Sequence, residues 1–145
     1  MRKRSIAIVL AGILTVLSPV AAFADSTQAK TDVPYVSLGA DLNQQERATV
    51  LKLLGVTEND LKNYTVATVT NAEEHDYLDS YLSQSVIGSR ALSSVLVEGK
   101  KEGSGITVST SNITYCTAGM YENALATAGI KDADIKVAGP FNISG

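Results

Sequence analysis

The sequence predicts an α/β or α+β domain in which three helices pack on a mixed sheet, in the order β-α-β-α-β-β-α-β. Two observations support this prediction. Capping residues precede segments with helical apolar spacing, and segments rich in β-branched residues alternate with those helices. We expect the domain to occupy residues 33–145, either as a single unit or as part of a longer natural domain.

The first and third predicted helices begin at clear capping residues. Asn43 precedes Glu46 by three positions, and Gly55 supplies the left-handed position that ends a helix over residues 44–54. The third helix begins at a threonine cap and closes at a glycine, over residues 117–129.

The second predicted helix is the longest of the three. It is capped either by Thr70 with Glu73 or by Asn71 with Glu74, and Gly88 ends or bends it. Its apolar face follows the i, i+3, i+4, i+7, i+8 rule at Leu78, Tyr81, Leu82, Ser85 and Val86.

The remaining periodic segments predict strands. Residues 33–38, 64–70, 93–98, 106–111 and 134–141 are β-branched, alternating or short apolar runs. A glycine-rich charged turn separates the third and fourth of them, so we expect these two strands to pair as a hairpin.

A weak internal echo suggests a β-α-β pseudo-repeat. Leu54-Gly55-Val56 with Asp60-Leu61-Lys62 recurs 74 positions later as Ala128-Gly129-Ile130 with Asp134-Ile135-Lys136. The alternative interpretation is two helix ends that use the same glycine cap.

Residues 1–24 have the features of a cleavable secretory signal peptide. Arg2, Lys3 and Arg4 precede an apolar run over residues 6–17, and Ala22-Phe23-Ala24 has the small-x-small form of a cleavage site. The apolar run is shorter than the roughly 20 residues that span a bilayer. An uncleaved anchor is the alternative.

Cleavage would place the mature protein outside the cytosol. We expect it to begin at Asp25, with a disordered lead-in over residues 25–32, and to be secreted or extracellular, in association with the cell envelope or free of it. Stable membrane insertion is not expected after cleavage.

Charge and cysteine content narrow the possible partners. The chain has 12 basic and 15 acidic residues. After removal of the three basic leader residues, 9 basic residues remain, and the mature protein has a net charge of −6. Nucleic acid is therefore disfavoured as a partner, because binding to it depends on basic patches.

Cys116 is the only cysteine, so no intramolecular disulfide can form. No cofactor motif is present, and we expect none.

The only cluster of titratable residues lies at the start of the second helix. His75 and Asp79 are four positions apart and share a face, so they could ligate a metal or form a base with its orienting group. Helix capping by acidic residues explains the same pattern, and one histidine is too few for a zinc motif. We therefore expect no metal site. Cys116 is a third weak catalytic candidate, although a buried free cysteine usually serves only in packing.

Two tyrosines are candidates for binding. Tyr77 and Tyr81 lie one helical turn apart and could line a groove, although such tyrosines also form the edges of cores.

Three segments together resemble a known family. They are YTVATVTNAEEHDYL, SSVLVEGKKEGSGITVSTSNIT and TYCTAGMYENALATAGIKDADIKVAGPFNISG, within residues 64–145. The chain resembles, over most of its length, the YpuA-like family of exported proteins of unknown function from Gram-positive bacteria. The resemblance implies export and a longer protein with a further helical region. It implies no activity and no catalytic residue.

The sequence favours an exported, non-enzymatic protein that binds an unknown protein or a cell-wall component. Two alternatives stay open. The first is a cell-wall or peptide hydrolase that uses His75, Asp79 or Cys116, and the second is a regulatory or stress-linked accessory protein.

Overall fold

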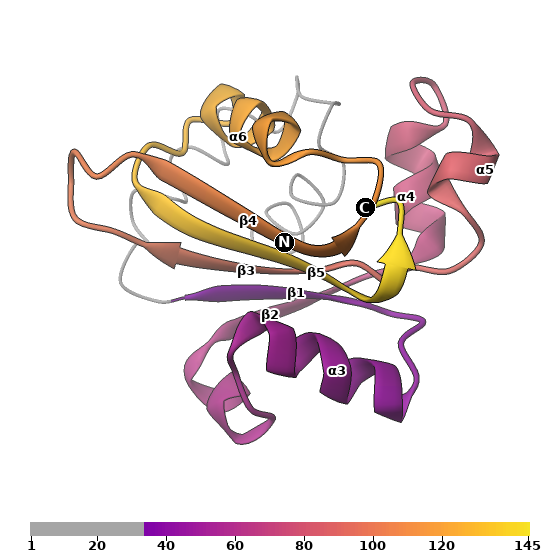
Figure 1. The fold of residues 1–145 in the computed structure, drawn as a ribbon, viewed down its shortest axis with the longest axis horizontal. Coiled ribbons are helices and arrows are strands. Elements are labelled where there is room, and N and C mark those ends of the chain that lie inside the picture. The colour runs from indigo at the N-terminus through magenta and orange to yellow at the C-terminus, as the bar shows by residue number, and fades with distance from the viewer. Residues whose placement is uncertain (1–33) are drawn as a thin grey trace.

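A computed structural model describes residues 34–145, in which helices cover a five-stranded sheet (Figure 1). The strands are β1 (Tyr35–Gly39), β2 (Thr65–Val69), β3 (Ser94–Gly99), β4 (Ile106–Ile113) and β5 (Ala133–Ile143). The helices are α3 (Gln44–Leu54), α4 (Asn71–Leu78), α5 (Gln84–Ile87) and α6 (Ala118–Thr127), with a 3-10 helix, η1, at Asn59–Asn63. The α+β class and the mixed sheet are as the sequence predicts.

The N-terminal predictions concern residues before position 34. The signal peptide, its cleavage site at Ala22, Ala24 and Asp25, and the lead-in over residues 25–32 lie outside the described residues. From residue 34 onward, no helix combines the length and the apolarity that crossing a membrane requires.

The strands lie in the order β2-β1-β3-β5-β4, and all of them except β3 run in the same direction. β1 pairs in parallel with β2, β5 pairs in parallel with β4, and β3 is antiparallel to both of its neighbours. Four strands therefore end at the same edge of the sheet, marked by Gly39, Val69, Ile113 and Ile143. We call this edge the carboxyl edge; it faces right in Figure 1.

The expected hairpin between the third and fourth strands is wrong. β5 lies between β3 and β4 and pairs with both of them. Burial explains this order. β5 is buried at Ala133, Ile135, Val137, Ala138 and Gly139, whereas no residue of β4 is fully buried. The strand with the larger number of buried residues belongs in the centre of a sheet, and a half-exposed strand belongs at its edge.

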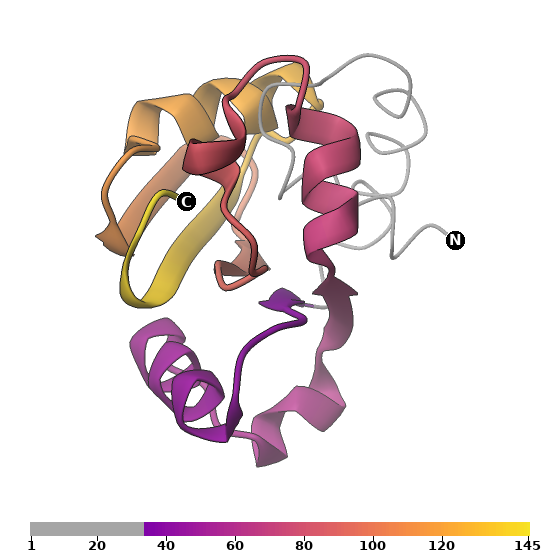
Figure 2. The same cartoon turned by 90° about the vertical axis from the view of Figure 1, so that its right-hand side faces the viewer.

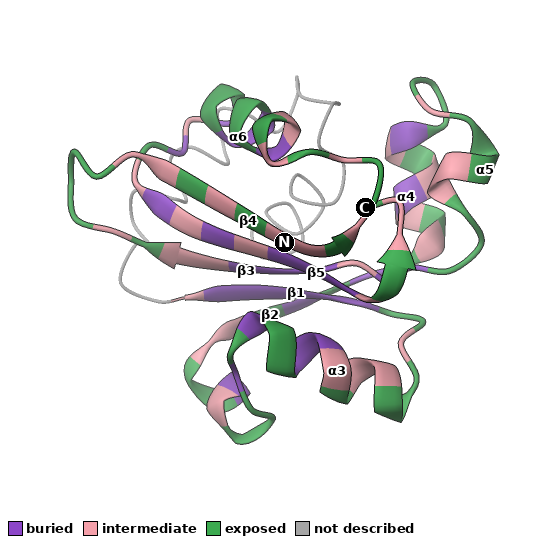
Figure 3. Ribbon diagram, viewed as in Figure 1, coloured by how far each residue is buried: buried purple, intermediate pink, exposed green. Residues whose placement is uncertain are grey.

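The two faces of the sheet carry separate cores, covered by α6 and α3 (Figure 2). On the α6 face, Tyr121 and Leu125 pack with Tyr35 and Ile135 among others. On the α3 face the cluster is Val36, Leu38, Val50, Leu51, Leu54, Val56, Leu61, Leu96 and Ala138. Figure 3 shows the burial concentrated on the central strands.

Both halves contain a parallel β-α-β unit, β1-α3-β2 and β4-α6-β5. The repeated glycines end the two helices in the same way. Gly55 and Gly129 have φ of 80° and 89°, and the residues after them, Val56 and Ile130, each donate a 3.0 Å bond to a carbonyl five positions back. The remainder of the echo differs, because one copy lies in η1 and the other in β5.

The two β-α-β units differ in hand. Their strands all run in one direction, and both crossovers step toward the β2 edge of the sheet. Because α3 and α6 cover opposite faces, the two connections have opposite hands. One of them is therefore of the left-handed kind that is rare among parallel crossovers.

The second predicted helix is divided in two. α4 ends at Leu78, and α5 begins after Ser83, which is extended at φ −68° and ψ 151°. Asp79, Ser80 and Ser83 explain the break, because short polar side chains compete for backbone hydrogen bonds and favour caps and turns. Residues 34–145 thus contain four α-helices where the sequence predicts three.

Candidate functional site

The carboxyl edge brings several chain segments together. α4 starts immediately after β2, with Thr70 as its cap, and the chain returns to the same edge between α5 and β3. Thr70 accepts a bond from the Glu73 amide at 3.2 Å, and Glu73 accepts one from the Thr70 amide at 2.9 Å. This reciprocal cap fixes the first turn of α4 and with it the polar side chains described next.

His75 links α4 to the segment that follows α5. Its Nδ1 lies 2.7 Å from Asp79 Oδ1, and its Nε2 lies 2.9 Å from the carbonyl oxygen of Gly88. The predicted pairing of His75 with Asp79 is therefore present. Hydrogen bonds to Asp79 and to Gly88 raise the pKa of His75 above its ordinary value, because both favour the charged ring.

Glu74 is the buried acid of this cluster. Only 8% of the residue is exposed, and Asn71 Nδ2 donates to Glu74 Oε2 at 3.1 Å and to the Gly88 carbonyl at 3.2 Å. Burial raises the pKa of Glu74 to about 7; the Asn71 bond opposes this rise and nearby Asp41 adds to it. Asn71, Glu74, His75, Asp79 and Gly88 form what we call the α4 cluster.

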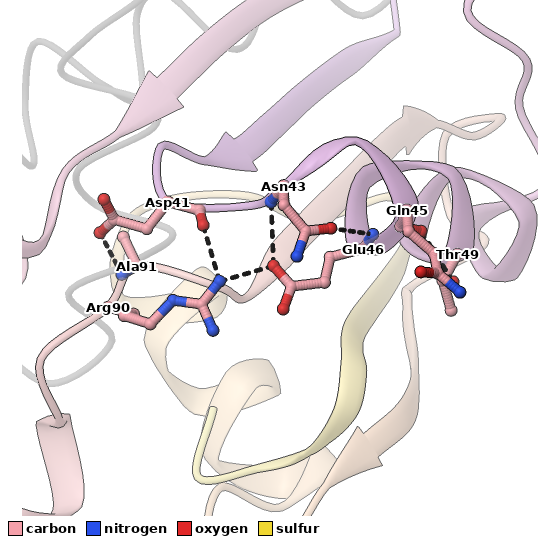
Figure 4. Close-up of polar contacts among 7 residues, drawn as sticks. All are labelled: Asp41, Asn43, Gln45, Glu46, Thr49, Arg90 and Ala91. Carbon is pink, nitrogen blue, oxygen red and sulfur yellow. Dashed lines mark hydrogen bonds and ion pairs between the residues drawn. The ribbon is translucent and has the colours of Figure 1, made fainter.

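A second polar network, drawn in Figure 4, ties the start of α3 to the segment before β3. Arg90 Nη2 donates to the Asp41 carbonyl at 2.9 Å and to Glu46 Oε2 at 2.6 Å, and Asp41 Oδ2 accepts from the Ala91 amide at 2.7 Å. Glu46 also closes the cap with Asn43, and the Asn43 amide and Arg90 together lower the pKa of Glu46. This network fixes the segment before β3 against the start of α3 at the carboxyl edge.

Cys116 has other neighbours than His75. It lies on the segment between β4 and α6, beside the buried Tyr121, and its amide donates to the Ser144 carbonyl at 3.0 Å. Burial raises the pKa of the thiol, and a contact with Tyr121 partly offsets the rise. No hydrogen bond joins Cys116 to His75 or Asp79 among the described residues, so the three catalytic candidates do not form one constellation.

Three exposed aromatic side chains lie on separate segments, after α4, after β4 and near the end of β5. Tyr81 (59% exposed) lies between α4 and α5, Tyr115 (48%) follows the end of β4, and Phe141 (47%) lies near the end of β5. Tyr77, on α4, is only half-buried, and the break after Leu78 removes Tyr81 from its helix. We call Tyr81, Tyr115 and Phe141 the aromatic set.

The burial of Glu74 and the exposure of Phe141 were not predicted from the sequence. Glu74 lies four residues before Leu78, on the face of α4 that becomes buried, and this spacing could have identified it. Phe141 is exposed because β5 is irregular there. Ser111 pairs with Ala138, but Ile113 pairs with Ile143, so residues 139–142 face only Asn112. No local pattern in the sequence gives that irregularity.

The donors and acceptors of the α4 cluster are mostly used internally. Within residues 34–145, no three His, Cys, Asp or Glu side chains are grouped so that they could hold a metal ion. A shallow depression of about 430 Å³ lies elsewhere, beside α6 and the start of β4, and is lined by Ile106, Glu122, Asn123, Ala126, Ile130 and Lys131. It contains none of the candidate residues named above.

Fold and site together define an α+β domain with a polar cluster and exposed aromatic residues at the carboxyl edge of a mixed sheet. Residues 38–145 match the family described as "Protein of unknown function (DUF1002)", and the chain belongs to that family. It is 45% identical, over 145 residues, to the "Uncharacterized protein YpuA" of Bacillus subtilis (strain 168). That alignment covers 100% of this chain and 48% of the relative, so the chain spans about half the relative's length. No solved structure matches it.

Proposed function

We propose that this protein is an exported, non-enzymatic protein that binds a protein or cell-wall component in the bacterial envelope through its carboxyl edge. The aromatic set carries the proposal. Tyr115 and Phe141 lie where β4 and β5 end at the carboxyl edge, and Tyr81 follows α4, the helix that begins there. Aromatic residues dominate binding energy where they are exposed in a free protein and buried in its complex.

The state of the candidate catalytic groups supports a non-enzymatic role. A general base needs a free lone pair, but both ring nitrogens of His75 face acceptors within the protein. A cysteine nucleophile needs a thiolate, but burial raises the pKa of Cys116 and keeps the thiol protonated. Neither group is prepared for nucleophilic catalysis.

One observation favours a hydrolase as a second candidate. Glu74 has a pKa of about 7, in the range that suits a general acid or base at neutral pH. A cell-wall hydrolase of this kind would lose its activity in Glu74→Gln and keep it in Glu122→Gln, which changes an exposed carboxylate on α6. Equal release of wall fragments by both variants would exclude Glu74 from such chemistry.

The binding proposal is tested with variants of the aromatic set. Tyr81→Ala, Tyr115→Ala and Phe141→Ala should each weaken retention on purified cell walls or on immobilised envelope proteins by about fivefold or more. Leu53→Ala and Val66→Ala are matched controls, because both side chains are exposed and apolar (39% and 38%) and lie on α3 and β2. Equal loss in both groups, or no loss in either, would contradict an aromatic binding edge.

Export is tested separately from binding. The protein recovered from the medium or the envelope of the native bacterium should begin at Asp25 when its N-terminus is sequenced. Intracellular protein that still carries Met1 as its dominant form would overturn export, whatever the result of the binding assay.

A further inference from the structure

The Gly88 carbonyl is the point at which α4 holds the segment after α5. Two side chains of α4 donate to this one oxygen, His75 Nε2 at 2.9 Å and Asn71 Nδ2 at 3.2 Å. Gly88 itself has φ 80° and ψ −169°, a conformation open essentially only to glycine, and its amide donates to the Gln84 carbonyl at 2.8 Å. The position of its carbonyl is thus fixed by α5 on one side and by α4 on the other.

The two acceptors around His75 determine how many protons the ring must carry. Asp79 presents a carboxylate oxygen to Nδ1 at 2.7 Å, and Gly88 presents a carbonyl oxygen to Nε2. A neutral imidazole has one N–H and one lone pair, so it can satisfy only one of these oxygens. Only the imidazolium donates to both.

We propose that His75 is an acid-closed clasp, which binds the segment after α5 to α4 when its ring is doubly protonated and releases it when the ring loses a proton. The carboxylate of Asp79 holds the remaining proton on Nδ1, because a charge-assisted bond is the stronger of the two. The lone pair of Nε2 then faces the Gly88 carbonyl. The contact between α4 and Gly88 is therefore the one that opens.

The acidic groups around the clasp favour its closed state. Glu74, on α4, and Asp41, before α3, both face the cluster, and Asp79 contacts the ring. Arg90 is held by Glu46 and the Asp41 carbonyl, and α5 carries no titratable side chain. As pH rises, Glu74 gains a negative charge, and this charge raises the pKa of His75 and favours the imidazolium. The ionised Glu74 therefore moves the opening of the clasp to higher pH, and the clasp opens when His75 itself loses its proton.

Release of Gly88 would affect more than one bond. The segment between α5 and β3 carries Arg90, whose bonds to Asp41 and Glu46 hold the start of α3, and Tyr81 lies in the turn that connects α4 to α5. The clasp therefore gives the carboxyl edge a pH-dependent rigidity. This inference goes beyond the proposed binding role and requires no ligand.

The experiment uses the fact that His75 is the only histidine in the chain. In the full-length protein, one imidazole Cε1–H signal in an NMR titration reports the clasp without ambiguity. Its midpoint should lie above the ordinary value of about 6.5 and should fall in Asp79→Asn, which keeps the shape of the side chain but removes its charge. Asp76→Asn is the matched control and should leave the midpoint unchanged.

Hydrogen exchange then tests whether the clasp opens. Protection of the Ile87 and Gly88 amides, corrected for intrinsic exchange, should fall about fivefold as His75 titrates, the equivalent of one hydrogen bond. Amides of Val95 and Ile135, in the core, report global unfolding and serve as the reference. The fall should persist in Glu74→Gln, where the buried carboxyl group no longer titrates. In the double variant His75→Gln/Glu74→Gln, in which the amide that replaces the imidazole can still donate to Gly88, the protection should not depend on pH over the same range.

A His75 midpoint at or below its ordinary value, or one that Asp79→Asn does not move, would overturn the proposal. So would protection of Gly88 that stays constant while His75 titrates, or that changes equally in the double variant His75→Gln/Glu74→Gln. Loss of binding in the aromatic variants has no bearing on these outcomes, so failure of the clasp and failure of the proposed function can be told apart.

Discussion

Gly39 at the end of β1 packs directly against the backbone of Ala91. A Cβ atom placed on Gly39 would lie 2.3 Å from the Ala91 carbonyl oxygen and 2.9 Å from the Cα atom of Leu92. That same carbonyl accepts a 3.1 Å bond from the Asp41 amide, so it cannot move away without breaking a contact. At this point of the carboxyl edge, the backbone at the end of β1 therefore contacts the backbone of the segment before β3.

Gly39→Ala is therefore expected to destabilise the protein by about 1–3 kcal/mol, through steric overlap with fixed backbone atoms. The measurement is the free energy of unfolding in urea. Gly119→Ala is the control, because a Cβ there meets only Thr117 Oγ1 at an ordinary 3.9 Å. The control should be neutral or stabilising by about 0.5–1 kcal/mol, since alanine is the better helix former. Similar losses in both variants would contradict the packing argument.

Ser94 contributes to the same junction through its hydroxyl group. It is fully buried (0% exposed), and its Oγ accepts a 3.2 Å bond from the Gly39 amide. Ser94→Ala leaves that buried N–H without its acceptor, which should cost about 1–3 kcal/mol. Ser109→Ala, on the exposed side of β4, should change the free energy of unfolding by less than about 0.5 kcal/mol. If the two variants are equally stable, the Ser94 bond contributes nothing.

The cap of α3 gives a third prediction. Asn43→Ala removes the acceptor of the Glu46 amide and should lower the free energy of unfolding by about 1 kcal/mol, whereas Asn43→Asp should preserve stability. Glu46→Ala should cost more than Asn43→Ala, because Glu46 also accepts from Arg90 at 2.6 Å. Thermal or urea unfolding of the three variants checks the order, and a reversed order would mean that Arg90 adds nothing to the cap.

Helix α3 shows how far sequence reasoning extends. Asn43, Glu46 and Gly55 fix its ends at Gln44 and Leu54, as the sequence predicts, because caps are short-range interactions encoded in neighbouring residues. The split between α4 and α5 was missed for the opposite reason. The apolar spacing continues across the break, and only Asp79, Ser80 and Ser83 signal it.

Strand order was beyond sequence reasoning because it depends on long-range pairing. The turn between β3 and β4 has the composition of a hairpin turn, but the buried side chains of β5 displace β4 to the edge. At the candidate site, the spacing of His75 and Asp79 was sufficient to predict their contact. The partners Asn71 and Gly88 were not predicted as a set, because Gly88 reaches α4 only through the fold.

Cys116 should react slowly in the folded protein. Burial raises the pKa of its thiol, so the thiolate that attacks alkylating reagents is scarce at neutral pH. Iodoacetamide should modify Cys116 at least about tenfold faster in urea than in the native state at the same pH. Mass spectrometry over time measures both rates. Native alkylation as fast as that of the unfolded chain would show an activated cysteine and would favour the hydrolase alternative.

Glu74 should make the protein less stable as pH rises. Burial raises its pKa from 4.5 to about 7, so between these values the folded protein binds a proton that the unfolded chain has released. The contribution is complete below pH 4.5 and is lost as pH increases through 7, by as much as about 3 kcal/mol. Glu74→Gln, which mimics the neutral acid, should abolish this slope and be more stable than wild type at pH 8.

Urea unfolding at several pH values between 5 and 8 measures the slope directly. His75 contributes with the same sign, because its raised pKa favours folding at low pH and this gain is lost as pH rises past its folded pKa. The comparison of Glu74→Gln with wild type is therefore repeated in the His75→Gln background, which leaves only the carboxyl group to titrate. Glu122→Gln, on the exposed surface of α6, controls for the loss of one negative charge. A wild-type slope that persists in Glu74→Gln would mean that Glu74 is ionised in the folded protein across this range, and that its surroundings stabilise the carboxylate.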